Sequence, residues 1–176
     1  NKAQQHAANN LEKGSTKIST SLDSGKGMKG VTRAFERTFG RGSATPENMA
    51  RVASDLSGMA AALRDTGAGA IPANGMTTNQ INSVYGGDHT GTLAAVPRQG
   101  PSQVIINTSH VNFRNTSRLS WAAGHETAHA VHGYIDVMVN GYKGYKFGSP
   151  EQIESFNNFP PPLRLTNPDH LMDFVQ

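Results

Sequence analysis

One pentapeptide, His125-Glu126-Thr127-Ala128-His129, carries side chains that could bind a metal ion and catalyse a reaction. Residues four apart lie on the same face of a helix, so the imidazoles of His125 and His129 can converge on one metal ion. Zinc suits imidazole nitrogen, and a catalytic zinc site needs three protein ligands and one water. Glu126 can then take a proton from that water as a general base. The pattern H-E-x-x-H therefore predicts zinc-dependent hydrolysis of an internal peptide bond.

The sequence around the motif predicts the helix that this chemistry requires. Residues 117–124 offer capping hydroxyls followed by small helix formers, and Gly133 is placed to end the helix. In the alternative interpretation, the two histidines lie on a solvated or core face and Glu126 is a surface charge. The helical context favours the metal site.

A third metal ligand has to come from outside the motif, and four candidates follow it: His132, Asp136, Glu151 and Glu154. His132 lies about 10 Å from His125 along a continuing helix, which suits a structural or supporting role. Asp136 comes three residues after Gly133, and a glycine there lets the chain reverse so that the carboxylate can return to the metal. Asp136 is therefore the preferred third ligand.

The two glutamates lie further along, in a predicted short helix. Ser149-Pro150-Glu151-Gln152 has the pattern of an N-cap, a proline at the first helical position, an acidic first turn and a capping-box glutamine, which explains Glu151 without a metal. Glu154 lies one turn further on. It is the alternative third ligand, as in the zinc peptidases in which a downstream helix donates a glutamate.

These residues resemble the aspzincin metalloendopeptidases, which include deuterolysin and the fungal peptidyl-Lys metalloendopeptidases. In that family H-E-x-x-H is followed by a G-T-x-D segment whose Asp binds zinc, and here Gly133-Tyr134-Ile135-Asp136 matches it with Tyr in place of Thr. The resemblance extends from about residue 30 to the end of the chain. It implies a zincin-like fold and a Zn²⁺ ion bound by His125, His129 and Asp136.

The resemblance also suggests two further site residues. The family has a tyrosine that stabilises the oxyanion shortly after the Asp; Val139 occupies that spacing here, so Tyr142 takes this role, with Tyr145 as the alternative. A C-terminal N-A-D segment followed by an aromatic is similar to Asn167-Pro168-Asp169 with Phe174. The resemblance therefore implies that Asp169 binds substrate.

Composition agrees with one catalytic domain. A chain of 176 residues can bury a single core, and we expect residues 28–176 to form it after a flexible N-terminal arm or linker at 1–27, which is rich in Gly and Ser. The net charge of +3 comes from scattered Lys and Arg, and Arg33, Arg37 and Arg41 at helical spacing indicate a solvated helix face. The sequence has no dense basic stripe of the kind that would predict nucleic-acid binding. It also has no apolar run long enough to predict a membrane span.

Cysteine is absent, which excludes a disulfide framework, a thiolate metal site and a cysteine peptidase. The N-terminus carries no signal sequence and no initiator Met, so we expect a piece of a larger protein that is secreted or delivered into a target cell. By analogy with aspzincin-like domains, this piece would be the toxic C-terminal domain of a bacterial effector, acting on a protein or peptide substrate and opposed by a cognate immunity protein. The alternatives are a module with a structural zinc, whose fourth ligand would be His132, and a metal-dependent nuclease, which the His pair disfavours.

The pattern along the chain predicts an α+β fold that is mainly helical, with a small sheet beside the motif helix. Val31, Phe35 and Phe39 indicate a helix that ends at Gly40, and Thr45-Pro46-Glu47 opens a second helix. Residues 66–101 suggest a loop with a hairpin around 85–88, whereas 104–107 and 111–113 are predicted strands. Residues 160–162, all proline, predict a stiff link to a closing helix.

Overall fold

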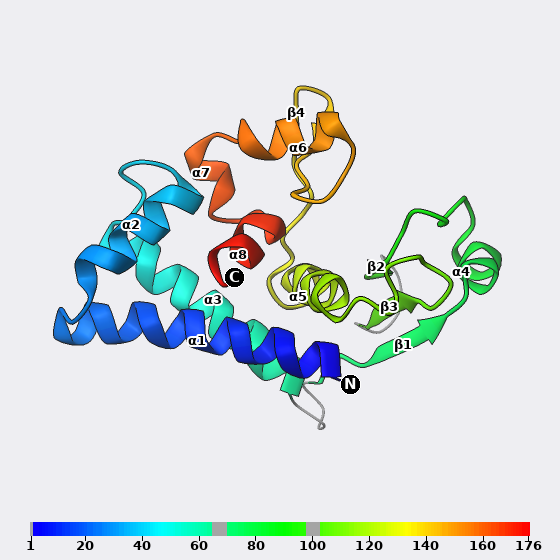
Figure 1. The fold of residues 1–176 in the computed structure, drawn as a ribbon, viewed down its shortest axis with the longest axis horizontal. Helices are drawn as coiled ribbons and strands as arrows, with labels where there is room; N and C mark the ends of the chain where they lie inside the picture. Colours follow the sequence, from blue (N-terminus) through cyan, green and yellow to red (C-terminus); the bar gives the residue numbers. More distant parts are fainter. Residues whose placement is uncertain (1, 65–69, 98–102) are drawn as a thin grey trace. The chain divides into compact units, whose positions relative to one another are not determined.

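The computed structural model describes residues 2–64, 70–97 and 103–176, and the described chain is α+β and mainly helical with a small sheet (Figure 1). The chain forms two compact units, each built from two segments of the sequence. The first unit contains Asn1–Asn9 and Met59–Gly133, and the second contains Asn10–Gly58 and Tyr134–Gln176. Two helices, α1 (Lys2–Ser24) and α3 (Pro46–Arg64), contribute residues to both.

The first unit carries a three-stranded sheet and the helix with the H-E-x-x-H motif. Its further elements are β1 (Ala73–Met76), α4 (Thr78–Tyr85), β2 (Ala94–Ala95), β3 (Val104–Asn107) and α5 (Thr116–His132). The strand order is β1-β3-β2, with β1 parallel and β2 antiparallel to the central strand β3. The predicted strand 104–107 is confirmed as β3, whose four residues are all buried.

A compact apolar cluster joins this sheet to α5. Val104 and Ile106 of β3 pack with Leu119 of α5, and Ala3 and Ile71 complete the cluster. Alternate residues of a strand point to the same face, so the two β3 side chains can contact one helix together. The sheet therefore lies beside α5, as the sequence predicts.

The second unit is mainly helical and has one short hairpin. Its further elements are α2 (Met28–Phe39), β4 (Met138–Val139), β5 (Tyr142–Lys143), α6 (Pro150–Asn157), α7 (Pro161–Arg164) and α8 (Pro168–Phe174). The hairpin turns at Asn140 and Gly141, whose φ angles of 54° and 84° are the positive values that a tight two-residue turn requires. Phe35 and Phe39 of α2 pack against Phe174 of α8, with ring centroids 5.7 and 5.5 Å away.

The predicted helices of this unit are confirmed. α2 buries Val31, Phe35 and Phe39 and ends at Gly40. α3 begins at Pro46, where the Thr45 hydroxyl accepts the Asn48 N–H at 3.2 Å. At Ser149 the capping box of α6 forms as the sequence indicates, with Gln152 as its second member. The proline run at 160–162, predicted as a stiff link, enters the short helix α7, which lies in the sequence between α6 and the closing helix α8.

The expectation of a flexible arm at residues 1–27 is wrong for Lys2–Ser24, which form the 23-residue helix α1. The small residues that suggested a linker are sites of close packing. A Cβ on Gly14 would lie 2.7 Å from Cγ1 of Val175, and the Ser15 hydroxyl donates to the Ala53 carbonyl at 2.7 Å. Gly and Ser at these positions therefore allow other segments of the second unit to approach the helix.

Two further local predictions are wrong. The segment 111–113 forms turns, because its backbone bonds locally: the Phe113 N–H donates to the His110 carbonyl at 2.9 Å. The expected hairpin around 85–88 is replaced by the end of α4, which begins with a capping box formed by Thr77 and Gln80. The remainder of the predicted loop includes residues 66–69 and 98–101, which lie outside the described residues.

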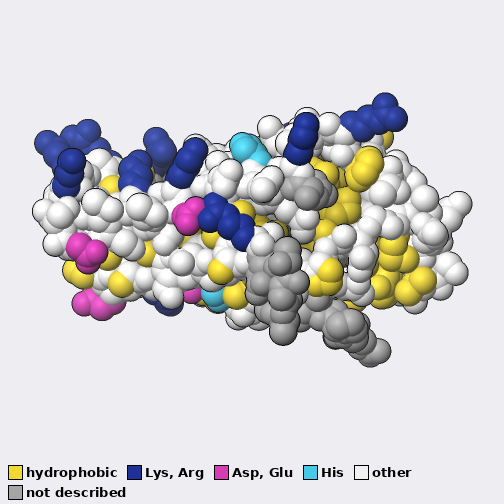
Figure 2. Space-filling view, turned by 90° about the horizontal axis from the view of Figure 1, so that it is seen from below, with side chains coloured by type: hydrophobic (Ala, Val, Ile, Leu, Met, Phe, Trp, Pro, Cys, Tyr) yellow, Lys and Arg dark blue, Asp and Glu magenta, His cyan; other side chains and the backbone are white. Residues whose placement is uncertain are grey.

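The exposed basic residues agree with a solvated helix face. Arg33, Arg37 and Arg41 are all exposed, and in Figure 2 the Lys and Arg side chains form separate groups on the face that is shown, without one continuous stripe. Among the described residues, no helix combines the length and the apolar character needed to cross a bilayer.

His170 is a core histidine of the second unit. Its ring stacks on Phe156 with centroids 4.1 Å apart, and its Nδ1 lies 3.0 Å from Oδ1 of Asn167. Burial disfavours the charged imidazolium, and the nearby positive charge of Arg164 adds to this effect. Together they lower the pKa of His170 to about 3. The neutral ring can therefore donate from Nδ1 to the Asn167 oxygen.

This burial predicts a stability that depends on pH. Between pH 6.5 and about 3, His170 binds a proton in the unfolded chain but stays neutral in the folded protein. Its contribution to the free energy of unfolding is therefore complete above pH 6.5 and is lost as the pH falls. The loss approaches about 1.4 kcal/mol per pH unit. Urea unfolding of the wild type and of His170→Phe, which keeps a stacked ring, should show a smaller fall in the free energy of unfolding for the variant. Equal slopes in the two proteins would contradict this assignment.

Candidate metal centre

The ends of α5 are fixed by local hydrogen bonds. The Asn115 side chain accepts the Arg118 N–H at 3.1 Å and caps the N-terminus, so an amide performs the task that we expected from a hydroxyl in 117–124. Gly133 ends the helix as predicted, with a left-handed φ of 65° and an N–H that donates to the His129 carbonyl at 3.0 Å. His129 therefore lies in the last turn of the helix.

Two buried hydroxyls of α5 lie within hydrogen-bonding distance of partners. The hydroxyl of Thr127, which is fully buried, donates to the Ala123 carbonyl at 2.6 Å. The hydroxyl of Ser120 lies 3.2 Å from Nδ1 of His6 on α1, within the first unit. These contacts hold the rotation of α5 about its axis, and with it the direction in which the motif side chains point.

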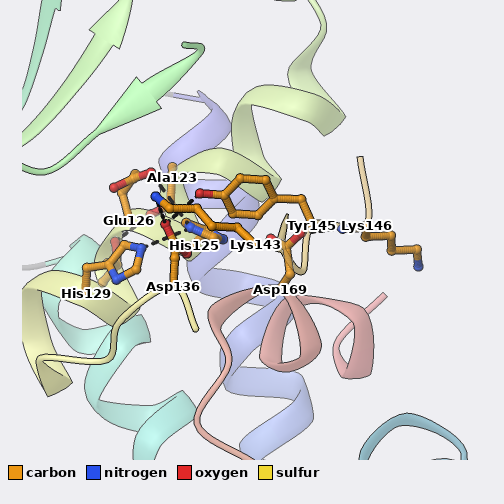
Figure 3. Close-up of polar contacts among 10 residues, drawn as sticks. Ala123, His125, Glu126, His129, Asp136, Lys143, Tyr145, Lys146 and Asp169 are labelled. Atoms are coloured by element: carbon orange, nitrogen blue, oxygen red, sulfur yellow. Dashed lines mark hydrogen bonds and ion pairs between the residues drawn. The ribbon is translucent and has the colours of Figure 1, made fainter. Parts of the chain in front are cut away.

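The structure brings together His125, Glu126 and His129 (Figure 3). Nε2 of His125 lies 3.0 Å from Nε2 of His129, and Oε1 of Glu126 lies 4.0 Å from Nε2 of His125. One ligand atom from each residue falls within 4.8 Å of the others. The side chains of His125 and Glu126 are 9% and 13% exposed, so the group is shielded but reachable.

The two histidines fit a zinc ion. Zn–N bonds of about 2.0–2.1 Å at a tetrahedral angle place two ligand nitrogens roughly 3.3 Å apart. The observed 3.0 Å needs only a small outward movement of either ring. The rings stand at 74° to each other, so they are not stacked face to face. A donor set of imidazole nitrogens with a nearby carboxylate suits zinc better than it suits Mg²⁺ or Ca²⁺.

Asp136 belongs to the second unit and is held there by two donors (Figure 3). The Tyr145 hydroxyl donates to Oδ2 of Asp136 at 2.6 Å, and Nζ of Lys143 lies 3.2 Å from the same oxygen. The Asp136 side chain is only 15% exposed. Within this unit, Asp136 is therefore a carboxylate fixed by the segment that follows β4.

The other predicted site residues have different surroundings. Tyr142 lies on β5 and is 48% exposed, and it is Tyr145 that contacts Asp136. Asp169 is buried at the start of α8 and accepts the backbone N–H of Lys146 at 2.6 Å. This bond gives Asp169 a structural task within the second unit.

The remaining candidate ligands are divided between the two units. His132 lies in the last turn of α5 in the first unit and is partly buried. Glu151 and Glu154 are both exposed on α6 in the second unit. Glu151 accepts the Ser149 hydroxyl at 2.6 Å, a bond that lowers the pKa of its carboxyl group, so the predicted capping environment explains it.

One polar contact of the second unit, close to the motif only in the sequence, was not predicted. The hydroxyl of Tyr134 donates to Oδ2 of Asp55 at 2.6 Å. Burial raises the pKa of Tyr134, and the bond to the Asp55 carboxylate raises it further. The available signal was the position of Asp55 on the stripe of α3 that carries Val52 and Leu56, where a carboxylate needs a partner. This bond fixes the residue that directly follows Gly133.

No protein family, curated protein or solved structure matches this chain. The assignment of a function therefore depends on the chemistry of the chain's own residues.

The motif geometry predicts one zinc ion per chain. His125→Ala and His129→Ala should each raise the zinc dissociation constant by more than about 100-fold, beyond the usual effect of losing an outer hydrogen-bond partner. His132→Ala is the matched control on the same helix and should bind zinc as the wild type does. Chelator competition measures all four proteins, and circular dichroism verifies their folding. Loss of zinc in His132→Ala as well would indicate a structural site in which this histidine is a ligand.

Proposed function

We propose that this protein is a zinc-dependent endopeptidase. The observation that carries the proposal is the 3.0 Å separation of the two Nε2 atoms of His125 and His129, with the Glu126 carboxylate beside them on the same helix. Two converging imidazoles and an adjacent carboxylate make up most of what metal-assisted hydrolysis needs from a protein.

In this proposal His125 and His129 hold the ion through Nε2, and Glu126 moves the proton. When bound, zinc supplies a Lewis acid that polarises the scissile carbonyl and brings the pKa of a coordinated water to about 7. The Glu126 carboxylate takes a proton from the attacking water and passes it to the nitrogen of the leaving amine. The low exposure of Glu126 keeps bulk water away from this transfer.

Asp136 is proposed as the third ligand because of its position in the chain. Gly133 ends α5 four residues after His129, and its left-handed conformation turns the chain out of the helical path. Asp136 follows three residues later, in a segment that matches the aspzincin pattern described above. Glu154, on the exposed surface of α6, is the alternative ligand.

We further propose a zincin-like fold and an aspzincin-like relationship. The three-stranded sheet packed against the motif helix supports this proposal. For the biological setting of the protein, we propose the one expected from the sequence. The domain is secreted or delivered into a target cell and acts as a bacterial toxin on protein or peptide substrates. It has a cognate immunity protein.

Glu126→Gln tests the mechanism. The amide cannot accept the proton, so turnover of a denatured protein substrate should fall by at least about 100-fold, the low end of what general base catalysis contributes. Zinc content should stay at the wild-type level, because Glu126 is not a ligand in this scheme. A Gln variant that binds zinc and cleaves the substrate at the wild-type rate would exclude the mechanism.

Asp136→Ala and Glu154→Ala identify the third ligand. Loss of Asp136 should weaken zinc binding strongly, whereas loss of the exposed Glu154 should leave the dissociation constant nearly unchanged. Isothermal titration with zinc compares the two variants under one condition. The reverse ranking would assign the protein to the class of peptidases with a glutamate as third ligand.

A further inference from the structure

Two donors from one short segment meet at a single oxygen of Asp136. The Tyr145 hydroxyl and the Lys143 ammonium lie 2.6 and 3.2 Å from Oδ2. The ammonium also lies 5.9 Å from the centre of the Tyr145 ring, so the two side chains approach the carboxylate as neighbours. One donor is neutral and the other carries a full positive charge.

The backbone between these two residues has little freedom. Gly144 is buried against Phe159, and a Cβ at this position would lie only 2.4 Å from Cε2 of that ring. The Tyr145 N–H donates to the Gln152 carbonyl at 3.3 Å, and the next N–H, of Lys146, donates to Asp169. The segment is therefore fixed to both α6 and α8, within the second unit.

The hairpin that precedes this segment is fixed in the same way. The buried Ser155 of α6 places its hydroxyl 2.9 Å from the Tyr142 carbonyl and 3.1 Å from the Val139 carbonyl. One hydroxyl thus contacts both strands of the hairpin close to the turn. A rigid support of this kind can hold the Tyr145 hydroxyl at a constant position relative to Asp136.

We propose that Tyr145 is a positioning residue for the third zinc ligand, and that Lys143 opposes zinc binding at the same carboxylate. The proposal deepens the proposed function and rests on it, because it takes Asp136 as the third ligand. Tyr145 acts through Asp136, which is a different task from contact with the substrate oxyanion.

The two side chains have opposite effects on zinc affinity for a physical reason. The neutral Tyr145 hydroxyl orients the carboxylate before the metal binds, and outer partners of metal ligands typically change affinity by about 10- to 100-fold. The Lys143 ammonium repels an approaching divalent cation and competes with it for Oδ2. Its side chain is 45% exposed, so solvent screens the repulsion and the expected effect is a smaller one.

The test compares zinc dissociation constants of the full chain by chelator competition. Tyr145→Phe keeps the ring and removes the hydroxyl, and it should weaken zinc binding by about 10-fold or more. Lys143→Met keeps the length of the side chain and removes the charge, and it should tighten binding about threefold. Tyr142→Phe, the same change on the exposed neighbouring strand, should bind zinc with wild-type affinity.

A second measurement separates positioning from a general loss of structure. Cobalt(II) should replace zinc, and its visible absorption spectrum should change in Tyr145→Phe, because the Asp136 ligand is no longer held. The unfolding temperature of each variant is recorded beside it. A merely structural role for the segment would lower stability in both the Tyr145 and the Lys143 variants and would not produce changes of opposite sign.

Each outcome decides the proposal. Unchanged zinc affinity in Tyr145→Phe overturns it, as does unchanged or weaker binding in Lys143→Met. Asp136→Ala, measured alongside, distinguishes a failure of the proposed ligand set from a failure of the positioning role alone. If Asp136→Ala binds zinc as the wild type does, the proposed ligand set fails and the positioning role fails with it. If Asp136→Ala binds weakly while Tyr145→Phe is normal, only the positioning role fails.

Discussion

The spacing of four residues between His125 and His129 on one helix is the constraint on which the rest of the account depends. A helix places such residues one above the other, and here the two Nε2 atoms lie 3.0 Å apart. The helix itself therefore brings the two imidazoles close to each other. Asn115 and Gly133 define where this helix begins and ends, and Leu119 packs against β3.

In the second unit, the carboxylate of Asp136 is held although this residue belongs to no helix or strand. In the sequence, Asp136 comes after α5 and before the hairpin, and its orientation comes from the side chains of the segment 143–145. That segment is fixed by close packing at Gly144 and by backbone bonds to α6 and α8. Asp169, which resembled a substrate-binding residue, contributes one of these bonds.

Sequence patterns predicted the features that local chemistry determines. The motif helix, the α6 capping box and the start of α3 at Pro46 all depend on residues within one or two turns of one another. The features that depend on distant partners were missed. Gly14 and Ser15 suggested flexibility, yet they allow close contact with Val175 and Ala53, residues that are far away in the sequence. Tyr145 was only an alternative because its partnership with Asp136 depends on the hairpin between them.

The short strands escaped prediction for a related reason. β1 contains Asn74 and Gly75, which have low strand propensity, and β2 has two residues. Both are strands because they pair with the apolar β3, which had the only strong local signal. Conversely, residues 111–113 have suitable side chains, but no strand among the described residues pairs with them, and local turn bonds determine their conformation.

The most direct test of the central claim is X-ray absorption spectroscopy of the zinc-loaded protein, which reports the atoms bound to the metal without any substrate. We expect a four-coordinate zinc with two imidazole nitrogens at about 2.0 Å, one carboxylate oxygen and one water oxygen. A zinc with four protein ligands and no water, or a metal with a single imidazole, would contradict it.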